Sequence, residues 1–347
     1  MNDNSVDAVF RILQGDIQGL TRNDIGLPFD QLNIDSFGLI SLRARLEQLV
    51  GREIGDDIWT SATCPADIIR MVSTDAICGE VSPSRETECR SFNINMPQMA
   101  MGGLSESWLF KELGDMHWNM ITDGLGSPSS ALLDGNGNRL YATFTRIAIR
   151  VGPLTSYGEN DGMVLRKTSF ARFGAGMFFS EIGISPGQGR AQLMSSFTSR
   201  GESGSNSSLQ KGQPQIPPGC KIPRLESYPA FADQYRARRG SVPAGCIFER
   251  EYEIVPQHDI NGVGLLYFAA YPIISEICLS KFEDQRHRGL TSKDVFYFGN
   301  CDENEVLLFR LHARAENRDS VAYEMSISRK SDDSLMAYLV TTKQTAR

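Results

Sequence analysis

The sequence is poor in metal-binding and disulfide-forming residues. Its 347 residues include only four histidines and seven scattered cysteines, and no two cysteines form a C-x-x-C pair. A structural zinc site or a disulfide framework needs clustered cysteines at regular spacing, so both are excluded. His117 and His258 are too isolated to indicate a metal pair. We therefore expect no metal and reduced thiols, as in a cytoplasmic protein.

Lysine is absent from the first 80 residues. They contain thirteen Asp or Glu and six Arg, a net charge of -7, which equals the net charge of the whole chain. The remaining 267 residues (347 minus 80) therefore balance at zero. An acidic N-terminal unit suits docking on basic patches of partner proteins and argues against a nucleic-acid partner.

Long apolar runs are scarce as well. No charged segment followed by an apolar run opens the chain, so we do not expect secretion. Residues 262–279 approach the length of a membrane span but include Glu276, Pro272 and two glycines. We expect this segment to be a helix buried inside the protein, and no membrane partner.

Residues 1–76 have the pattern of a small helical bundle. Helices are expected in "VDAVFRILQ", from Ser36 onward, where leucines recur at three- and four-residue spacing, and in "PADIIRMVS". Residues 77–91 are polar and poor in apolar side chains, as is typical of a linker.

The rest of the chain repeats one pattern twice, in residues 92–215 and 216–347. Each half has one helix, at 103–121 or 262–280, and a run of antiparallel strand patterns. Strands are expected at 139–152, 162–174, 176–184 and 191–200 in the first half, and at 246–255, 294–300, 305–316, 320–330 and 335–343 in the second. A helix that is apolar on nearly every side must be enclosed, and a curved sheet can enclose it. The predicted fold class is α+β: an all-α bundle, then a double hot-dog of two antiparallel sheets, each wrapped on a central helix. Ligand grooves are expected between the halves, and both a monomer and a homodimer are compatible with this pairing.

An Asp-Ser pair, Asp35-Ser36, opens the second helix of the acidic bundle. By this motif, the helix order and the charge, residues 1–76 resemble an acyl carrier protein. The resemblance implies a 4'-phosphopantetheine arm on Ser36, attached by a phosphopantetheinyl transferase. From the residues alone, Asp35 or Ser36 could equally cap the helix.

Four segments carry a second resemblance: "MPQMAMGGLSESWLFKELGDMHW", "RLYATF", "SSFTSRGESGSNSSLQKGQP" and "HDINGVGLLYFAAYP". Residues 92–347 resemble the double-hot-dog acyltransferase/decarboxylase family typified by the leinamycin-pathway enzyme. The family implies a tyrosine that takes an acyl group from coenzyme A, decarboxylation of a malonyl-type group, and transfer to a carrier thiol of a polyketide-type synthase. Tyr141 in "RLYATF" matches that tyrosine.

Chemistry at Tyr141 needs support from its neighbours. Phenols ordinarily have a pKa near 10 and are poor nucleophiles at pH 7 unless cations or donors stabilise the phenolate. Arg139 or Arg146 could do so. The alternative is a strand tyrosine whose ring is packed and whose hydroxyl lies at the rim.

The turn "MGGLSES" precedes the first long helix. Gly102 and Gly103 leave backbone N–H groups open where the helix dipole favours negative charge, so an oxyanion or a carboxylate could bind there. Ser105 and Glu106 are the catalytic candidates beside them. A capping box is the structural alternative.

Four further polar residues are candidates. Ser196 and Asn206 could bind the thioester carbonyl or the pantetheine amides, or lie in a solvated turn. Asp259 and Asn261 precede the second helix as secondary candidates, either as caps or with Asp259 activating water. A thioesterase or dehydratase, with Asp259 or Glu106 as base, and a non-catalytic acyl-binding module therefore remain alternatives to the acyltransferase.

Overall fold

The computed structural model describes residues 3–17, 19–32, 34, 36–50, 54, 59, 62–73, 88–128, 131–201, 204–239 and 245–345. The chain separates into two compact units, residues 1–82 and 83–347. Most of the expected linker, residues 77–87, lies outside the described residues. None of the helices in the described ranges is long and apolar enough to cross a lipid bilayer.

The first unit contains the three helices that the sequence predicts. They are α1 (Asp3–Asp16), α2 (Ser36–Val50) and α4 (Pro65–Ser73), with the 3-10 turn η1 (Phe29–Gln31) between the first two. Buried side chains of these helices and of the loops beside them form one apolar cluster: Val9, Leu13, Ile17, Leu20, Leu42, Leu46, Ile54 and Ile68. Ser36 is the first residue of α2, but its side chain and all of Asp35 lie outside the described residues.

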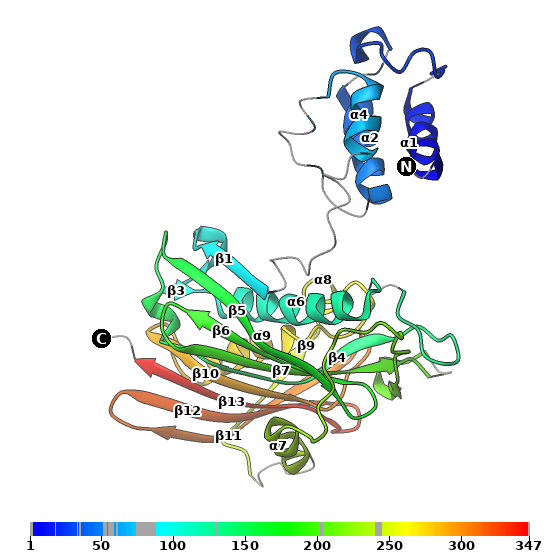
Figure 1. Ribbon diagram of the computed structural model, residues 1–347. Helices are drawn as coiled ribbons and strands as arrows, with labels where there is room; N and C mark the ends of the chain where they lie inside the picture. Colours follow the sequence, from blue (N-terminus) through cyan, green and yellow to red (C-terminus); the bar gives the residue numbers. More distant parts are fainter. Residues whose placement is uncertain are drawn as a thin grey trace. The chain divides into compact units, whose positions relative to one another are not determined.

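The second unit is built on one continuous antiparallel sheet (Figure 1). Its strand order is β1-β5-β6-β7-β4-β10-β13-β12-β11-β9, with β8 added beside β7. This order is symmetric about its centre. β4 and β10 are the central pair, and moving outward the equivalent strands are β7 and β13, β6 and β12, β5 and β11, and β1 and β9. The two expected sheets are therefore present as two matching halves, and pairing between β4 and β10 joins them into one.

Strand alternation predicted most of these strands to within a few residues, although β1 and β8 were not predicted. The first half contains β1 (Cys89–Asn93), β4 (Tyr141–Arg150), β5 (Gly162–Phe173), β6 (Met177–Ser185), β7 (Gly189–Ser199) and β8 (Gln210–Gly212). The second contains β9 (Phe248–Glu253), β10 (Arg288–Tyr297), β11 (Val306–Glu316), β12 (Ser320–Arg329) and β13 (Leu335–Thr345). A separate hairpin pairs β2 (Met99–Ala100) with β3 (Gly103–Leu104).

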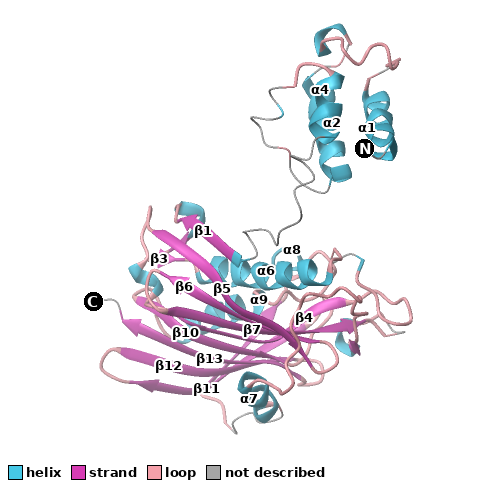
Figure 2. Cartoon of the chain, viewed as in Figure 1, coloured by secondary structure: helices cyan, strands magenta, loops and turns pink. Residues whose placement is uncertain are grey.

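Helices cover both faces of this sheet (Figure 2). The two long helices, α6 (Glu106–Leu125) and α9 (Ala270–Phe282), lie on one face of the sheet. Their apolar side chains are buried together with those of that face in the main core. Helix α7 (Ala230–Arg238) packs Phe231 on Phe179 and Met194. Side chains alternate along a strand, and the neighbouring Phe178 and Leu193 belong to the clusters that contain α6. Helix α7 therefore lies on the opposite face.

The second long helix begins later than the sequence predicts. It starts at Ala270 rather than at residue 262, after the short helix α8 (Pro256–Asp259) and a series of turns. Within these turns the Asn261 side chain accepts from the backbone N–H groups of Val263 and Leu265, and Gly264 has a φ of +80°. This loop replaces the first two helical turns and places Asn261, Val263 and residues 265–268 along the wall of a cavity.

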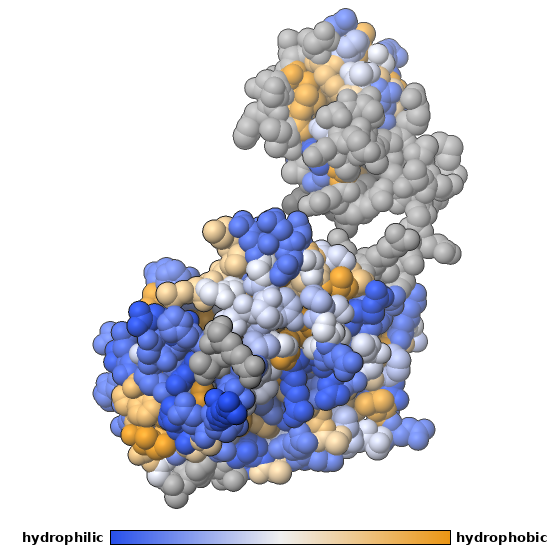
Figure 3. All heavy atoms as spheres, turned by 90° about the vertical axis from the view of Figure 1, so that its left-hand side faces the viewer, coloured by the Kyte–Doolittle hydropathy of each residue, from blue (hydrophilic) through white to orange (hydrophobic). Residues whose placement is uncertain are grey.

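The surface of this unit is mainly polar on the face shown in Figure 3, where apolar side chains form small separate groups. Among the large apolar residues with substantial exposure are Met96 and Met101, near the β2–β3 hairpin.

Candidate functional site

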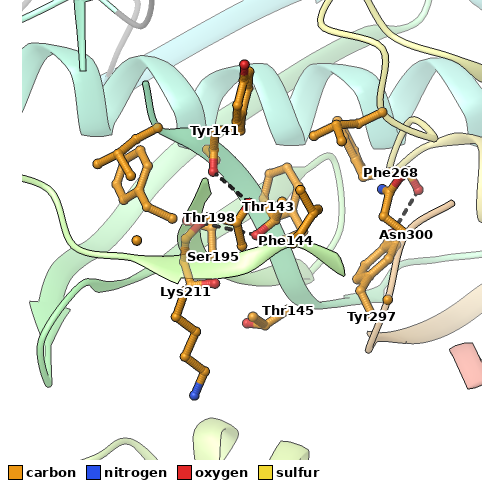
Figure 4. A pocket seen from close by; sticks show the side chains of 18 of the residues that line it. Tyr141, Thr143, Phe144, Thr145, Ser195, Thr198, Lys211, Phe268, Tyr297 and Asn300 are labelled. Carbon is orange, nitrogen blue, oxygen red and sulfur yellow. Dashed lines mark hydrogen bonds between the residues drawn. The ribbon is translucent and has the colours of Figure 1, made fainter. Parts of the chain in front are cut away.

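A cavity of about 770 Å³ lies where the two halves of the sheet separate. β4 pairs with β10 only over residues 146–150, so the first half of β4 has no partner on that side. Residues 139–145 and 195–198 line the cavity on one side, and residues 261–268 and 297–300 line it on the other. Figure 4 shows Tyr141, Thr143 and Phe144 on one side of the site and Phe268, Tyr297 and Asn300 on the other.

Tyr141 lines this cavity between two guanidinium groups. Nη1 of Arg200 donates to the Tyr141 hydroxyl at 3.3 Å, and the guanidinium carbon lies 4.9 Å from the ring centroid. Arg139 lies over the same ring at 5.5 Å. Arg200 is itself fixed, because Nε donates to Oδ1 of Asn206 at 3.0 Å and Nη2 to the carbonyl of Val263 at 2.5 Å. A cation is therefore held against the phenol oxygen.

The sequence did not identify Arg200 as the cation beside Tyr141, and Arg146, which it proposed for that role, does not contact Tyr141. The signal for Arg200 was available, since it follows "SSFTS" in a segment that carried the family resemblance. Arg146 is buried against α7: it forms a two-bond ion pair with Asp294 and donates to the carbonyl of Phe231. It therefore anchors α7 at the joint between the halves and does not contact Tyr141.

The other cavity tyrosines with hydroxyl partners differ from Tyr141. Tyr235, Tyr271 and Tyr297 each donate their hydroxyl proton to a backbone carbonyl, at 2.8–3.1 Å. Burial also raises the pKa of Tyr271 and of Tyr297 well above the ordinary value. These three act as neutral donors. Among the described cavity residues, Tyr141 is the tyrosine whose oxygen accepts from a cation.

Asn206 and Asn261 also line the cavity, but their side chains organise its walls. The Asn206 amide donates to the carbonyls of Gly264 and Cys301 while its oxygen holds Arg200. Both amide protons are thus used within the protein. Asn206 therefore joins the loop after β7 to the second half of the sheet and positions Arg200. Ser196 lines the cavity beside Thr143, whose hydroxyl donates to the Ser196 carbonyl.

Asp259 does not line the cavity. It is 3% exposed, and its carboxylate accepts from the Tyr252 hydroxyl and the Val255 N–H. The one carboxylate among the lining residues, Asp115, is paired with Arg90 at 2.8 Å. Within the described part of the chain, no unpaired carboxylate is therefore placed to activate water in the cavity.

The residues of the "MGGLSES" turn lie away from Tyr141. Helix α6 first reaches the cavity at Gly114, nine residues beyond Ser105, or about 13 Å along a helix. The Ser105 hydroxyl accepts from the N–H of Trp108, which makes it a helix cap. A Cβ on Gly103 would lie 2.3 Å from the Leu154 carbonyl, so this glycine permits close packing. Gly102 has a φ of +86°, which fits its turn.

Glu106 belongs to a buried ion cluster instead of the cavity. Lys293, which is 0% exposed, contacts Glu106 at 2.5 Å and Glu276 at 3.0 Å, and Lys343 pairs with Glu276. Burial opposes ionisation of Glu276, but the two ammonium groups outweigh it and lower the pKa to about 2. The cluster joins α6, α9, β10 and β13. Among the described residues, no group of three or more His, Cys, Asp or Glu is placed to hold a metal.

His117 is a buried polar residue next to the cavity. Its Nδ1 lies 2.7 Å from the Ser180 hydroxyl and its Nε2 lies 2.8 Å from that of Ser195. The ring is fully buried between Phe144 and Phe170. Burial lowers the pKa of His117 from 6.5 to about 3, so the imidazole is neutral at pH 7.

This shift predicts a pH-dependent stability. Above pH 6.5 His117 is neutral in both states; below it the unfolded chain binds a proton that the folded chain does not. The free energy of unfolding should therefore fall by up to about 1.4 kcal/mol per pH unit as the pH drops from 6.5 towards 4.5. Urea unfolding in His117→Gln should show a flatter dependence, whereas the exposed His287→Gln should behave as the parent. Equal slopes in all three proteins would contradict this assignment.

The comparisons with known proteins show the fold. No protein-family model matches the chain, and no curated protein matches its sequence. The chain is similar in structure to a putative oleoyl thioesterase from Lactobacillus plantarum, with a TM-score of 0.55 and 12% identity over 75% of this chain and 95% of that one. A 12:0-ACP thioesterase from Umbellularia californica follows, with a TM-score of 0.49, 10% identity and coverage of 74% and 96%. The predicted α+β class with hot-dog halves is confirmed, while the carrier bundle stays a prediction.

Proposed function

We propose that the chain is an acyl-thioester transferase that accepts an acyl group from coenzyme A on Tyr141. The contact between Arg200 and the Tyr141 hydroxyl carries this proposal. A guanidinium at hydrogen-bond distance orients the phenol oxygen and stabilises the negative charge that develops on it when the ester is cleaved. The cavity also contains Arg139, Lys211 and Arg239, none of which forms an ion pair within the described residues. This excess of positive charge favours a phosphate-bearing thioester.

The chemistry balances without a further reactant. The Tyr141 oxygen attacks the thioester carbonyl carbon, the C–S bond breaks, an aryl ester forms, and the phenol proton leaves with the coenzyme A thiol. A second thiol then attacks the ester, and the phenol is restored. The acceptor we propose is a 4'-phosphopantetheine thiol on Ser36, or that of a polyketide-type synthase.

Mass spectrometry of the intact chain tests this proposal. Incubated with simple and malonyl-type acyl-CoAs, the protein should gain the mass of one acyl group, and peptide mapping should place it on Tyr141. The same measurement distinguishes a retained malonyl-type group from one that has lost carbon dioxide. No mass gain together with no release of free acid would favour a non-catalytic binding module.

Hydrolysis is the second candidate, because the putative oleoyl thioesterase shares this fold. It requires a base that activates water, and the lining carboxylate Asp115 is already paired with Arg90. We therefore rank transfer first. Rapid release of free acid by the purified protein would reverse this order.

The carrier part of the proposal has its own test. With a phosphopantetheinyl transferase and coenzyme A, the chain should gain one phosphopantetheine, because Ser36 opens α2 as the attachment motif requires. Intact mass should show no gain in Ser36→Ala, whereas Ser73→Ala, at the end of α4, should be modified normally. Modification of Ser36→Ala would refute the attachment site.

A further inference from the structure

The hydrogen bonds of His117 form a buried chain that ends at the cavity. Ser180 and His117 are 0% exposed, and Ser195 is 2% exposed and lines the cavity. One ring nitrogen of a neutral imidazole carries the proton and the other accepts. The two serines contact opposite nitrogens of the ring. The tautomer therefore decides which serine donates its hydroxyl proton to the ring and which one accepts the proton of the ring.

The tautomer of His117 follows from the hydrogen bonding of Ser180. Its hydroxyl proton is buried and requires an acceptor, and among the described residues Nδ1 of His117 is the one within hydrogen-bond distance of this oxygen. Nδ1 must then be unprotonated, and Nε2 carries the proton and donates to the Ser195 oxygen. This leaves the O–H of Ser195 without an acceptor in the described part of the protein. A buried donor without an acceptor is costly, so the hydroxyl is suited to a ligand.

Ser195 is displaced from Tyr141 towards the closed end of the cavity. On β7 it lies three positions from Thr198, the pairing partner of Tyr141, or about 10 Å along the strand. Because this offset is odd, the Ser195 side chain points to the face of β7 that carries α6 and His117, opposite to that of Thr198. Its own partner is Phe144, whose ring lies 4.5 Å from that of Phe268. A Cβ on Gly114 would lie 2.2 Å from the Phe268 ring, so this aromatic pair closes the space against α6.

We propose that Ser195 is a binding residue for the acyl chain, and that its hydroxyl, oriented by the Nε2–H of His117, donates to an oxygen substituent of the acyl group. This inference rests on the proposed function, which places the thioester carbonyl at Tyr141. With the carbonyl there, an acyl chain that passes through the opening between β4 and β10 meets this donor some 10 Å along the strand, beyond the thioester. The site thus selects acyl groups with an oxo or hydroxyl substituent over plain alkyl groups.

The tautomer is tested first, and independently of any activity. Nitrogen-15 NMR of the labelled protein at pH 7 should show His117 neutral, with the proton on Nε2. In Ser180→Ala, Nδ1 loses its donor, and the population of the other tautomer should rise. A proton on Nδ1 of the unaltered protein would overturn the proposal, because the Ser195 proton would then be used by the ring.

Binding is tested with non-transferable coenzyme A analogues in which a methylene separates the sulfur from the carbonyl. By calorimetry, analogues of 9-oxodecanoyl- or 9-hydroxydecanoyl-CoA, whose oxygen lies about 10 Å from the thioester carbonyl along an extended chain, should bind the unaltered protein roughly 10-fold more tightly than the decanoyl analogue. Ser195→Ala should remove this preference and Ser195→Thr should keep part of it. The matched control is Ser326→Ala, a buried serine bonded to His312 outside the cavity.

The outcomes separate the two proposals. Equal affinity for oxygenated and alkyl analogues, or a preference that survives in Ser195→Ala, would overturn the role of Ser195 and leave acyl transfer intact. Failure of every analogue to bind, with the Nε2 tautomer confirmed, would count against both the role of Ser195 and the proposed transferase. A mass gain on Tyr141 without analogue discrimination would count against Ser195 alone.

Discussion

Tyr141→Phe should abolish the gain of acyl mass and lower acyl transfer by roughly 10³-fold or more, because the variant lacks the oxygen that forms the ester. The ring and its contacts with Arg139 and Arg200 should be retained, so the fold and the cavity should change little. Transfer from labelled acyl-CoA is measured by intact mass and by release of free coenzyme A thiol. Binding of a non-transferable analogue should remain within a few-fold of the parent.

Tyr228→Phe is the matched control. Tyr228 also lines the cavity, but its ring stacks on Arg236 and its hydroxyl has no partner in the described part of the chain, so activity should be unchanged. Arg200→Lys is the companion variant. A lysine cannot reproduce the planar fork that reaches Asn206, Val263 and Tyr141 together, so the rate constant for acylation should fall with little change in affinity. An acylated Tyr141→Phe protein would mean that the acyl group is attached elsewhere.

The predicted fold came mostly from local patterns, and these patterns succeeded where one face of an element is buried. Strand alternation located β4 and β5 to within about two residues, because burial on one face imposes the period of two. The start of α9 was wrong because an apolar run does not reveal that Asn261 and Gly264 fold back on the backbone. Helix α7 was missed because its nine residues include three charged side chains and one amide and lie between turn residues.

The candidate site was harder to predict because its contacts join segments far apart in the sequence. Tyr141 was identified by resemblance, but its cationic partner Arg200 lies 59 residues away and adjoins it only through the pairing of β4 with β7. Arg146 seemed equally suitable, yet a strand places it on the α7 face. Gly102 and Gly103 have the expected helix-terminal position, but α6 lines the cavity only from Gly114 onward. No local pattern specifies where along the joint between two similar halves the cavity opens.

Lys293→Met should cause the largest loss of stability, roughly 2–4 kcal/mol, because it leaves two carboxylates, 17% and 27% exposed, with one ammonium group. Lys293 is 0% exposed and contacts both Glu106 and Glu276, so neither charge can recover full hydration when it is removed. Urea unfolding followed by tryptophan fluorescence is a suitable measurement, because Trp108 and Trp118 both lie on α6. The midpoint should fall while the dependence on urea concentration stays constant.

The size of this effect depends on burial, and an exposed pair provides the comparison. Lys330 pairs with Glu251 at 2.8 Å, but both side chains are about half exposed, so Lys330→Met should cost less than about 1 kcal/mol. Adding Glu106→Gln to Lys293→Met removes one of the uncompensated charges and should recover part of the lost stability. A Lys293→Met protein as stable as Lys330→Met would show that the cluster does not hold the two long helices to the sheet. Recovery in the double variant would instead establish that unpaired charge, rather than lost packing of the lysine stem, causes the destabilisation.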